Sequence, residues 1–108
     1  MPQNRPRHAV VVGGASGIGA AIARALAADG ATVTVADRNK DQAIELAAEL
    51  GADHDAARVE VTDEDSVREL FETARATRGR LDIAVNSAGV SAAGAVTDLP
   101  VEKFRRVV

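Results

Sequence analysis

Glycines at a characteristic spacing follow the first apolar run of this chain, in a pattern typical of a loop that binds phosphate. Residues 9–19 read AVVVGGASGIG: an apolar run suited to a buried strand ends at paired glycines, and helical periodicity follows. Gly13, Gly17 and Gly19 have no side chain to keep an anion from the backbone N–H groups. Because these groups gather at a helix start, the loop predicts a site for a dinucleotide pyrophosphate, with Ser16 and Ile18 as further contacts.

A carboxylate and a guanidinium follow at the end of the next predicted strand. Asp37 lies 18 residues after Gly19, where its oxygens can accept hydrogen bonds from ribose hydroxyls. Its charge opposes the extra phosphate of NADP by about 1 kcal/mol in water and about 4 kcal/mol at an effective dielectric of 20, for unit charges about 4 Å apart. Arg38 can offset that charge or bind the phosphate. The pair predicts NAD, with NADP less favoured; a solvated acid at a strand end is the weaker interpretation of Asp37.

A second turn of small polar residues follows a later apolar run. Residues 81–89 read LDIAVNSAG, and the carboxyl ends of parallel strands meet at one edge of a sheet. Asn86 has donors and acceptors that can tie neighbouring loops together or bind a ribose, while Ala88 and Gly89 permit close backbone approach. An ordinary turn explains this composition equally well. Together with the first loop, however, the turn predicts that two loops contact one ligand.

Composition restricts the class of protein and its partners. The chain has 108 residues, 46% of them hydrophobic, a net charge of −3 and no cysteine. We expect one soluble domain over residues 8–108, preceded by a polar extension over residues 1–7. Scattered basic residues argue against nucleic acid and anionic membranes as partners, and the lack of cysteine suits the cytoplasm. His8 and His54 lack metal-ligand spacing, so no metal site is predicted and both are expected in water or at a strand edge.

Apolar runs alternate with amphipathic stretches, which predicts an α/β fold. We expect strands at residues 8–12, 32–36, 58–61 and 82–85, with helices between them. A hydroxyl cap at Thr62 is expected to begin the third helix, and a fourth helix begins near Asp98 and Pro100. The result is a partial Rossmann-like, doubly wound parallel sheet in the order 3-2-1-4. The apolar stripes expected to face it, helix by helix, are Ile18, Ile22, Ala25 and Leu26; Ala43, Ala47 and Leu50; and Val67, Leu70, Phe71 and Ala74.

These motifs together resemble the amino-terminal half of the short-chain dehydrogenase/reductase family. Residues 13–19 resemble its TGxxxGxG loop, with Val12 in place of the usual threonine. Residues 86–89 resemble its NNAG motif, with Ser87 as the second residue. Glu60 and Val61 resemble the Asp-Val pair that ends the third strand and contacts adenine. The resemblance covers the chain after its first few residues.

The resemblance implies an NAD(P)-dependent oxidoreductase that transfers hydride between its cofactor and a small carbonyl or alcohol substrate. The family's catalytic Ser, Tyr and Lys lie farther along its chains, and this chain contains no tyrosine. It is therefore expected to be a cofactor-binding portion, truncated before the catalytic half and inactive alone, whose intact parent forms a homo-oligomer. One alternative is a non-catalytic NAD-binding module. A weaker one is a methyltransferase, which also has a glycine-rich loop.

Overall fold

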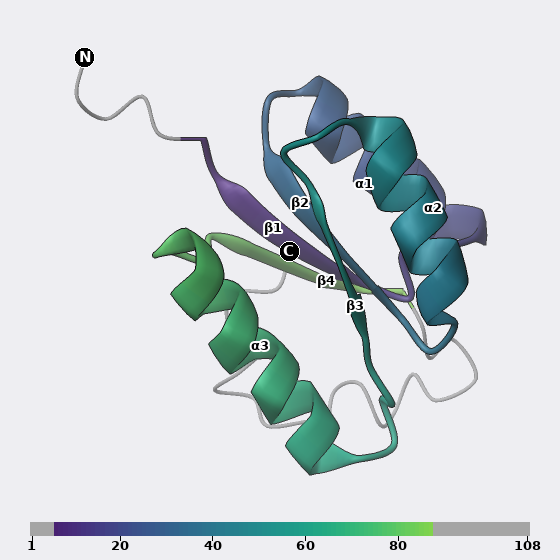
Figure 1. Cartoon of the computed structure of the whole chain (residues 1–108), viewed down its shortest axis with the longest axis vertical. Helices are drawn as coiled ribbons and strands as arrows, with labels where there is room; N and C mark the ends of the chain where they lie inside the picture. The colour runs from purple at the N-terminus through teal and green to yellow at the C-terminus, as the bar shows by residue number, and fades with distance from the viewer. Residues whose placement is uncertain (1–5, 88–108) are drawn as a thin grey trace.

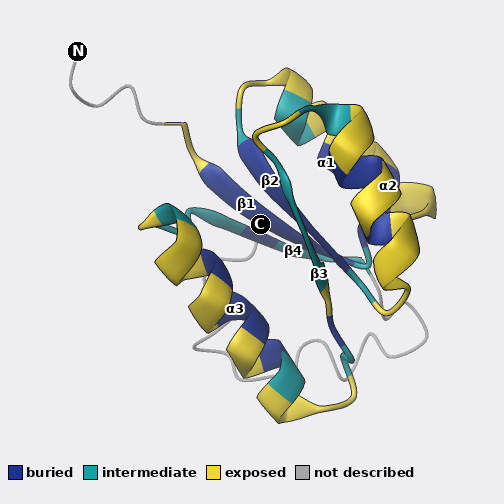
Figure 2. Ribbon diagram, in the orientation of Figure 1, coloured by how far each residue is buried: buried dark blue, intermediate teal, exposed yellow. Residues whose placement is uncertain are grey.

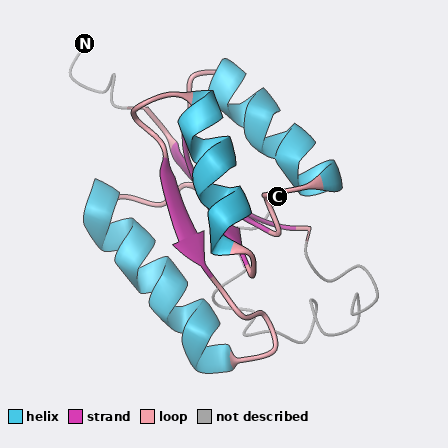
Figure 3. Cartoon of the chain, turned by 45° about the vertical axis from the view of Figure 1, so that its right-hand side comes forward, coloured by secondary structure: helices cyan, strands magenta, loops and turns pink. Residues whose placement is uncertain are grey.

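The computed structural model describes residues 6–87 as a parallel four-stranded sheet with helices on both faces (Figures 1 and 3). The strand order β3-β2-β1-β4 confirms the predicted topology. The expected fourth helix lies outside the described residues. In chain order the elements are β1 (His8–Val12), α1 (Gly17–Ala28), β2 (Thr32–Asp37), α2 (Lys40–Leu50), β3 (Asp55–Arg58), α3 (Glu64–Arg78) and β4 (Ile83–Asn86).

The two central strands are buried on both faces, with His8, Thr32 and Thr34 as polar residues among the apolar ones. Every residue of β1 is buried, as is every residue of β2 before Asp37. Val12 is in register with Ala36 on β2 and with Asn86 on β4, so the carboxyl ends of these strands lie together. The sheet thereby brings the chain segments that follow β1, β2 and β4 to one edge.

The helices separate the core into two layers. Helices α1 and α2 cover one face of the sheet and α3 covers the other, with their buried sides turned inward (Figures 1 and 2). On α3 the buried residues are the four that its apolar stripe predicts: Val67, Leu70, Phe71 and Ala74.

The predicted stripe of α1 was right for Ile22 and Leu26, which are half-buried against the core, and wrong for Ile18 and Ala25, which are exposed. Its buried residues are Gly19, Ala20 and Ala23, whereas Ile18 is 71% exposed. Small side chains let this helix approach the sheet closely, so the larger side chains lie beside the contact rather than in it. On α2, Ala43 and Ala47 are buried as predicted, together with Leu46; Leu50 is half-buried against the same cluster.

The third strand was predicted at residues 58–61, but the structure places it at Asp55–Arg58. Its ladder pairs Thr34 with Asp55 and Asp37 with Arg58. Val59 is buried directly after the strand, and its N–H still donates to the Asp37 carbonyl oxygen at 3.1 Å. Most of the predicted strand, residues 59–61, is therefore the segment that follows β3.

His8 is not in water, contrary to expectation, but is only 1% exposed in the central strand. Its Nδ1 lies 2.8 Å from the Arg80 carbonyl oxygen and its Nε2 lies 2.7 Å from Thr34 Oγ1. His54 is half-buried and its Nδ1 accepts a hydrogen bond from the Val33 N–H at 3.0 Å. Both rings therefore serve as structural hydrogen-bonding groups at the amino-terminal side of the sheet.

Candidate functional site

A cavity of about 430 Å³ lies at the carboxyl edge of the sheet. Asn86, at the end of β4, is not among the residues that line it, whereas its neighbour Ser87 is. Ala88 and Gly89 lie outside the described residues. The other predicted site residues all line the cavity: Gly13, Ser16, Gly17, Ile18, Gly19, Asp37, Arg38, Glu60 and Val61.

The glycine-rich loop is fastened to the end of β2 through its backbone. The N–H groups of Gly13 and Gly14 donate to the Ala36 carbonyl oxygen at 2.7 and 3.1 Å. The next N–H, that of Ala15, donates to Asp37 Oδ2 at 3.1 Å. Gly13 adopts a φ of 76°, a conformation that side chains disfavour, and this turns the chain from β1 towards α1.

Gly17 and Gly19 are needed for different reasons, one for its backbone conformation and the other for close packing. Gly17 has a φ of 59° and open space around it, so it supplies backbone freedom and an uncovered surface at the start of α1. Gly19 is buried, and a Cβ there would overlap the Gly13 carbonyl oxygen and Ser87 Oγ. The side chain of Ser16, the N-cap of α1, makes no capping hydrogen bond, and the first turn contains no acid. The positive end of the helix dipole therefore faces the cavity without an acid in the helix's own first turn, and the Asp37 carboxylate is bound one residue before the N-cap, at the Ala15 N–H.

Ser87 is a site residue that sequence reasoning missed. Its hydroxyl lies 3.1 Å from the Val12 carbonyl oxygen and 3.2 Å from that of Gly13, to which it donates. Its N–H donates to the Val12 carbonyl oxygen at 2.9 Å. Ser87, directly after β4, is thus held against the glycine-rich loop, a tying role of the kind considered for Asn86. The available signal was its position as the second residue of the NNAG-like motif.

The segment after β3 forms another wall. The Glu60 N–H donates to Ser66 Oγ at 2.9 Å, which joins this wall to the first turn of α3. Thr62 Oγ1 donates to the Glu60 carboxylate at 3.3 Å, and Arg58 Nη2 lies 3.7 Å from it. Val61 packs against the core under α3. Contacts within the chain therefore hold this wall in place without a ligand.

Side chains of opposite charge line the cavity where β2 ends. Asp37 is half-buried and Arg38 is exposed. Arg38 also lines an adjoining open hollow of about 470 Å³, together with Lys40 and Arg58. No cluster of acids or histidines suited to a metal ion occurs within residues 6–87. Within the same residues, no helix is both long and apolar enough to cross a membrane.

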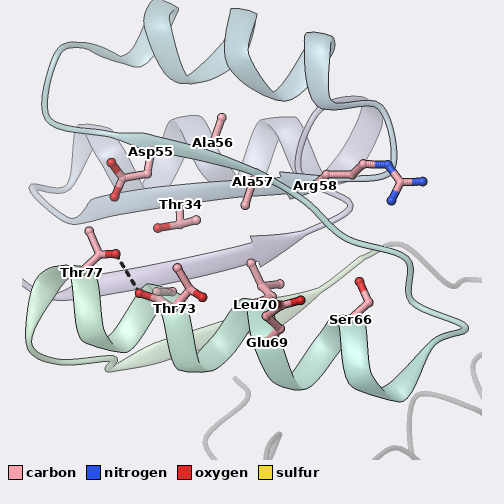
Figure 4. A pocket seen from close by; sticks show the side chains of 11 residues that line it. Thr34, Asp55, Ala56, Ala57, Arg58, Ser66, Glu69, Leu70, Thr73 and Thr77 are labelled. Carbon is pink, nitrogen blue, oxygen red and sulfur yellow. Dashed lines mark hydrogen bonds between the residues drawn. The ribbon is translucent and has the colours of Figure 1, made fainter.

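A second cavity, of about 270 Å³, lies between β3 and α3 (Figure 4). Several of its polar groups bond within the chain: Thr77 Oγ1 donates to the Thr73 carbonyl oxygen at 2.8 Å, as Figure 4 shows. Asp55 receives two hydrogen bonds from Arg78, at 3.0 and 3.1 Å. The cavity at the carboxyl edge of the sheet, which adjoins the glycine-rich loop, is the better candidate for a ligand site.

The fold and the loop define a Rossmann-like α/β chain. The sequence model described as short chain dehydrogenase matches residues 7–108, and the chain belongs to that family.

Three similar proteins each match most of this chain. An uncharacterized short-chain type dehydrogenase/reductase of Sinorhizobium fredii is 48% identical over 80 residues, which are 74% of this chain and 15% of that protein. An uncharacterized oxidoreductase of Staphylococcus aureus is 41% identical over 93% of this chain and 44% of its own length. A D-threitol dehydrogenase of Mycolicibacterium smegmatis is 44% identical over 89% of this chain and 38% of its own. The chain thus spans less than half the length of these relatives.

Proposed function

We propose that this chain is the NAD-binding portion of an oxidoreductase that transfers hydride between NAD and a carbonyl or alcohol substrate. The observation that carries the proposal is the single cavity shared by the glycine-rich loop, the end of β2 and the Glu60 wall. Membership of the short-chain dehydrogenase family supports the oxidoreductase class.

The residues of the cavity suit the parts of a dinucleotide. The start of α1, uncovered at Gly17, offers backbone N–H groups to the pyrophosphate. Asp37 retains oxygen lone pairs for ribose hydroxyls, and the exposed Ile18 with the half-buried Val61 offers apolar surface to adenine. NAD, when bound, supplies the hydride acceptor; in this proposal these residues bind and orient it.

NAD is proposed over NADP because of the charge on Asp37. A carboxylate about 4 Å from a 2′-phosphate costs the complex about 1 kcal/mol or more, which is a factor of five or more in affinity. Arg38 lies on the exposed side of the same cavity and reduces that discrimination. We therefore expect a preference rather than an absolute selection.

Titration of the purified chain with NADH, followed by nicotinamide fluorescence, tests the proposal. We expect one NADH per chain, displacement by adenosine diphosphate, and binding of NADPH that is about fivefold weaker. S-adenosylmethionine is not expected to compete, and competition by it would favour the methyltransferase alternative. A chain that stays folded but binds no dinucleotide would contradict the proposal.

A non-catalytic NAD-binding module is the second candidate, because the residues that line the cavity suit binding of a dinucleotide whether or not chemistry follows. The two candidates differ in the longer polypeptide. An oxidoreductase requires catalytic groups beyond Val108, whereas a binding module does not. An alcohol or carbonyl substrate, a homo-oligomeric parent and a cytoplasmic location stay predictions. Turnover of NADH by a polypeptide extended to the length of the relatives would exclude the module, and NADH binding without turnover would support it.

A further inference from the structure

Three consecutive N–H groups attach the glycine-rich loop to the end of β2. Two of them, from Gly13 and Gly14, share the Ala36 carbonyl oxygen, an acceptor that every residue type provides. The third, from Ala15, uses a side chain, Asp37 Oδ2, at 3.1 Å. The last of the three attachments therefore depends on the residue type at position 37.

The carboxylate that receives this third hydrogen bond is itself held in place. Asp37 Oδ1 accepts from the Asn39 N–H at 3.0 Å, and Asn39 Oδ1 accepts from the Gln42 N–H at 3.1 Å to cap α2. The carboxylate therefore bridges the loop after β1 and the start of α2. Its orientation is set by the chain's own backbone, without a ligand.

We propose that Asp37 positions the glycine-rich loop, in addition to the ribose contact proposed above. The carboxylate holds the Ala15 N–H, and with it the turn that presents Gly17 and the start of α1 to a phosphate. This role rests on the proposed function in one respect, the identity of the phosphate ligand that the loop binds. One consequence is that replacing Asp37 to admit NADP also disturbs the loop that binds the pyrophosphate of either cofactor.

The two roles of Asp37 make different predictions for a ligand that has no ribose. Inorganic pyrophosphate is such a probe. If Asp37 acts only through its charge and its ribose contact, Asp37→Ala and Asp37→Asn remove the same negative charge and bind pyrophosphate equally. If Asp37 positions the loop, only the alanine variant loses the acceptor for Ala15. The asparagine retains one oxygen, and the N–H of Asn39 that it then releases is exposed to water.

Calorimetric titration with pyrophosphate and with NADH separates these cases. We expect Asp37→Ala to bind pyrophosphate about fivefold more weakly than Asp37→Asn, the effect of one ordinary hydrogen bond. Glu45→Gln, which removes a charge from the exposed face of α2, serves as the matched control and is expected to bind as the unaltered chain does. Equal pyrophosphate affinities for the two Asp37 variants would overturn the positioning role.

A second measurement needs no ligand and keeps the inference separate from the proposed function. Amide hydrogen exchange by NMR should show Ala15 about tenfold less protected in Asp37→Ala than in Asp37→Asn or Glu45→Gln. If Asp37→Ala does not fold, the unaltered chain still gives an answer, because the Ala15 amide nitrogen should show a scalar coupling across its hydrogen bond to the Asp37 carboxyl carbon. Unchanged protection, or no such coupling at Ala15, would overturn the inference even if NADH binds. Failure to bind NADH with both Ala15 effects present would overturn only the proposed function.

Discussion

Gly19 connects the packing of α1 to the shape of the cavity. A methyl group in Gly19→Ala would overlap the Gly13 carbonyl oxygen and Ser87 Oγ. The first of these is backbone and cannot rotate away, so we expect a loss of about 3 kcal/mol in the free energy of unfolding, together with weaker NADH binding. Urea unfolding measures the first effect and fluorescence titration the second.

Gly17→Ala is the matched control for this substitution. The same methyl group there has open space around it, and only the φ of 59° is strained. We expect a loss of about 1–2 kcal/mol. Equal losses for the two variants would show that overlap with the Gly13 carbonyl is not what excludes a side chain at position 19.

Asp82 makes stability depend on pH at the opposite edge of the sheet. Hydrogen bonds from Arg80 lower the pKa of Asp82 below its usual 3.8, burial opposes this shift, and the His8 N–H adds to it. Since the folded-state pKa is depressed, the stabilisation is complete above about pH 4 and is lost as the pH falls through the folded value. Asp82→Asn should lower stability at pH 7 by about 1–2 kcal/mol.

The control for this prediction is Glu45→Gln, which changes charge on the exposed face of α2. Urea unfolding at about pH 2 to about pH 7 measures how the free energy of unfolding falls with pH. This fall should be smaller in Asp82→Asn than in the control. An identical pH dependence of stability in the two variants would show that Asp82 does not cause the loss of stability in acid.

Residue types were easier to predict from the sequence than their partners. The glycines and Asp37 were found from spacing, Glu60 and Val61 from the family resemblance, and all of them line one cavity. The roles of Ser87 and His8 were missed because their hydrogen-bond partners include the carbonyl oxygens of Val12 and Arg80, 75 and 72 residues away. Every residue carries such an acceptor, so no sequence pattern marks the ones that the fold brings close.

The start of α3 allows the sequence-based and structural interpretations to be compared directly. The sequence suggested Thr62 as the cap, whereas the structure has Asp63 as N-cap, with Oδ1 accepting from the N–H groups of Asp65 and Ser66 at 2.9 and 3.3 Å. Asp63→Ala should therefore cost about 1 kcal/mol in the free energy of unfolding. Thr62→Ala, the control, should stay within about 0.5 kcal/mol, and a larger loss there than at Asp63 would restore the original interpretation.

Strand positions followed from the sequence for β1, β2 and β4, whose expected bounds differ from those observed by at most one residue, and were misplaced for β3. Strands β1 and β2 are buried along almost their whole length. Strand β3 reads DAAR and has intermediate or exposed residues throughout, because it lies at an edge of the sheet. Its backbone ladder to β2 determines its place, and its short length and terminal charges limit pairing with other chains.

The order of the strands across the molecule was predicted correctly. Helices α1 and α2 lie on one face and α3, whose connection runs back across the sheet from β3 to β4, lies on the other, as crossovers of one hand require. The same order puts the segments after β1, β2 and β4 at one edge, so the location of the cavity follows from topology before any side chain is placed. Only the fine attachments, such as that of Ala15 to Asp37, required the structure.

The stability of the isolated chain is the last quantity that this architecture predicts. Within the described residues β4 pairs only with β1, α3 alone covers its face of the sheet, and Ile83 and Val85 remain half-buried. Ordering the backbone costs about 1–2 kcal/mol per residue, so incomplete cover of apolar surface removes much of the small surplus that stabilises a domain. We expect an unfolding free energy below about 5 kcal/mol and self-association at raised concentration. Urea unfolding and size-exclusion chromatography of the 108-residue chain, compared with a polypeptide extended to the length of the relatives, measure both. Reversible, cooperative unfolding of a monomer as stable as the extended polypeptide would show that the four-stranded unit is self-sufficient.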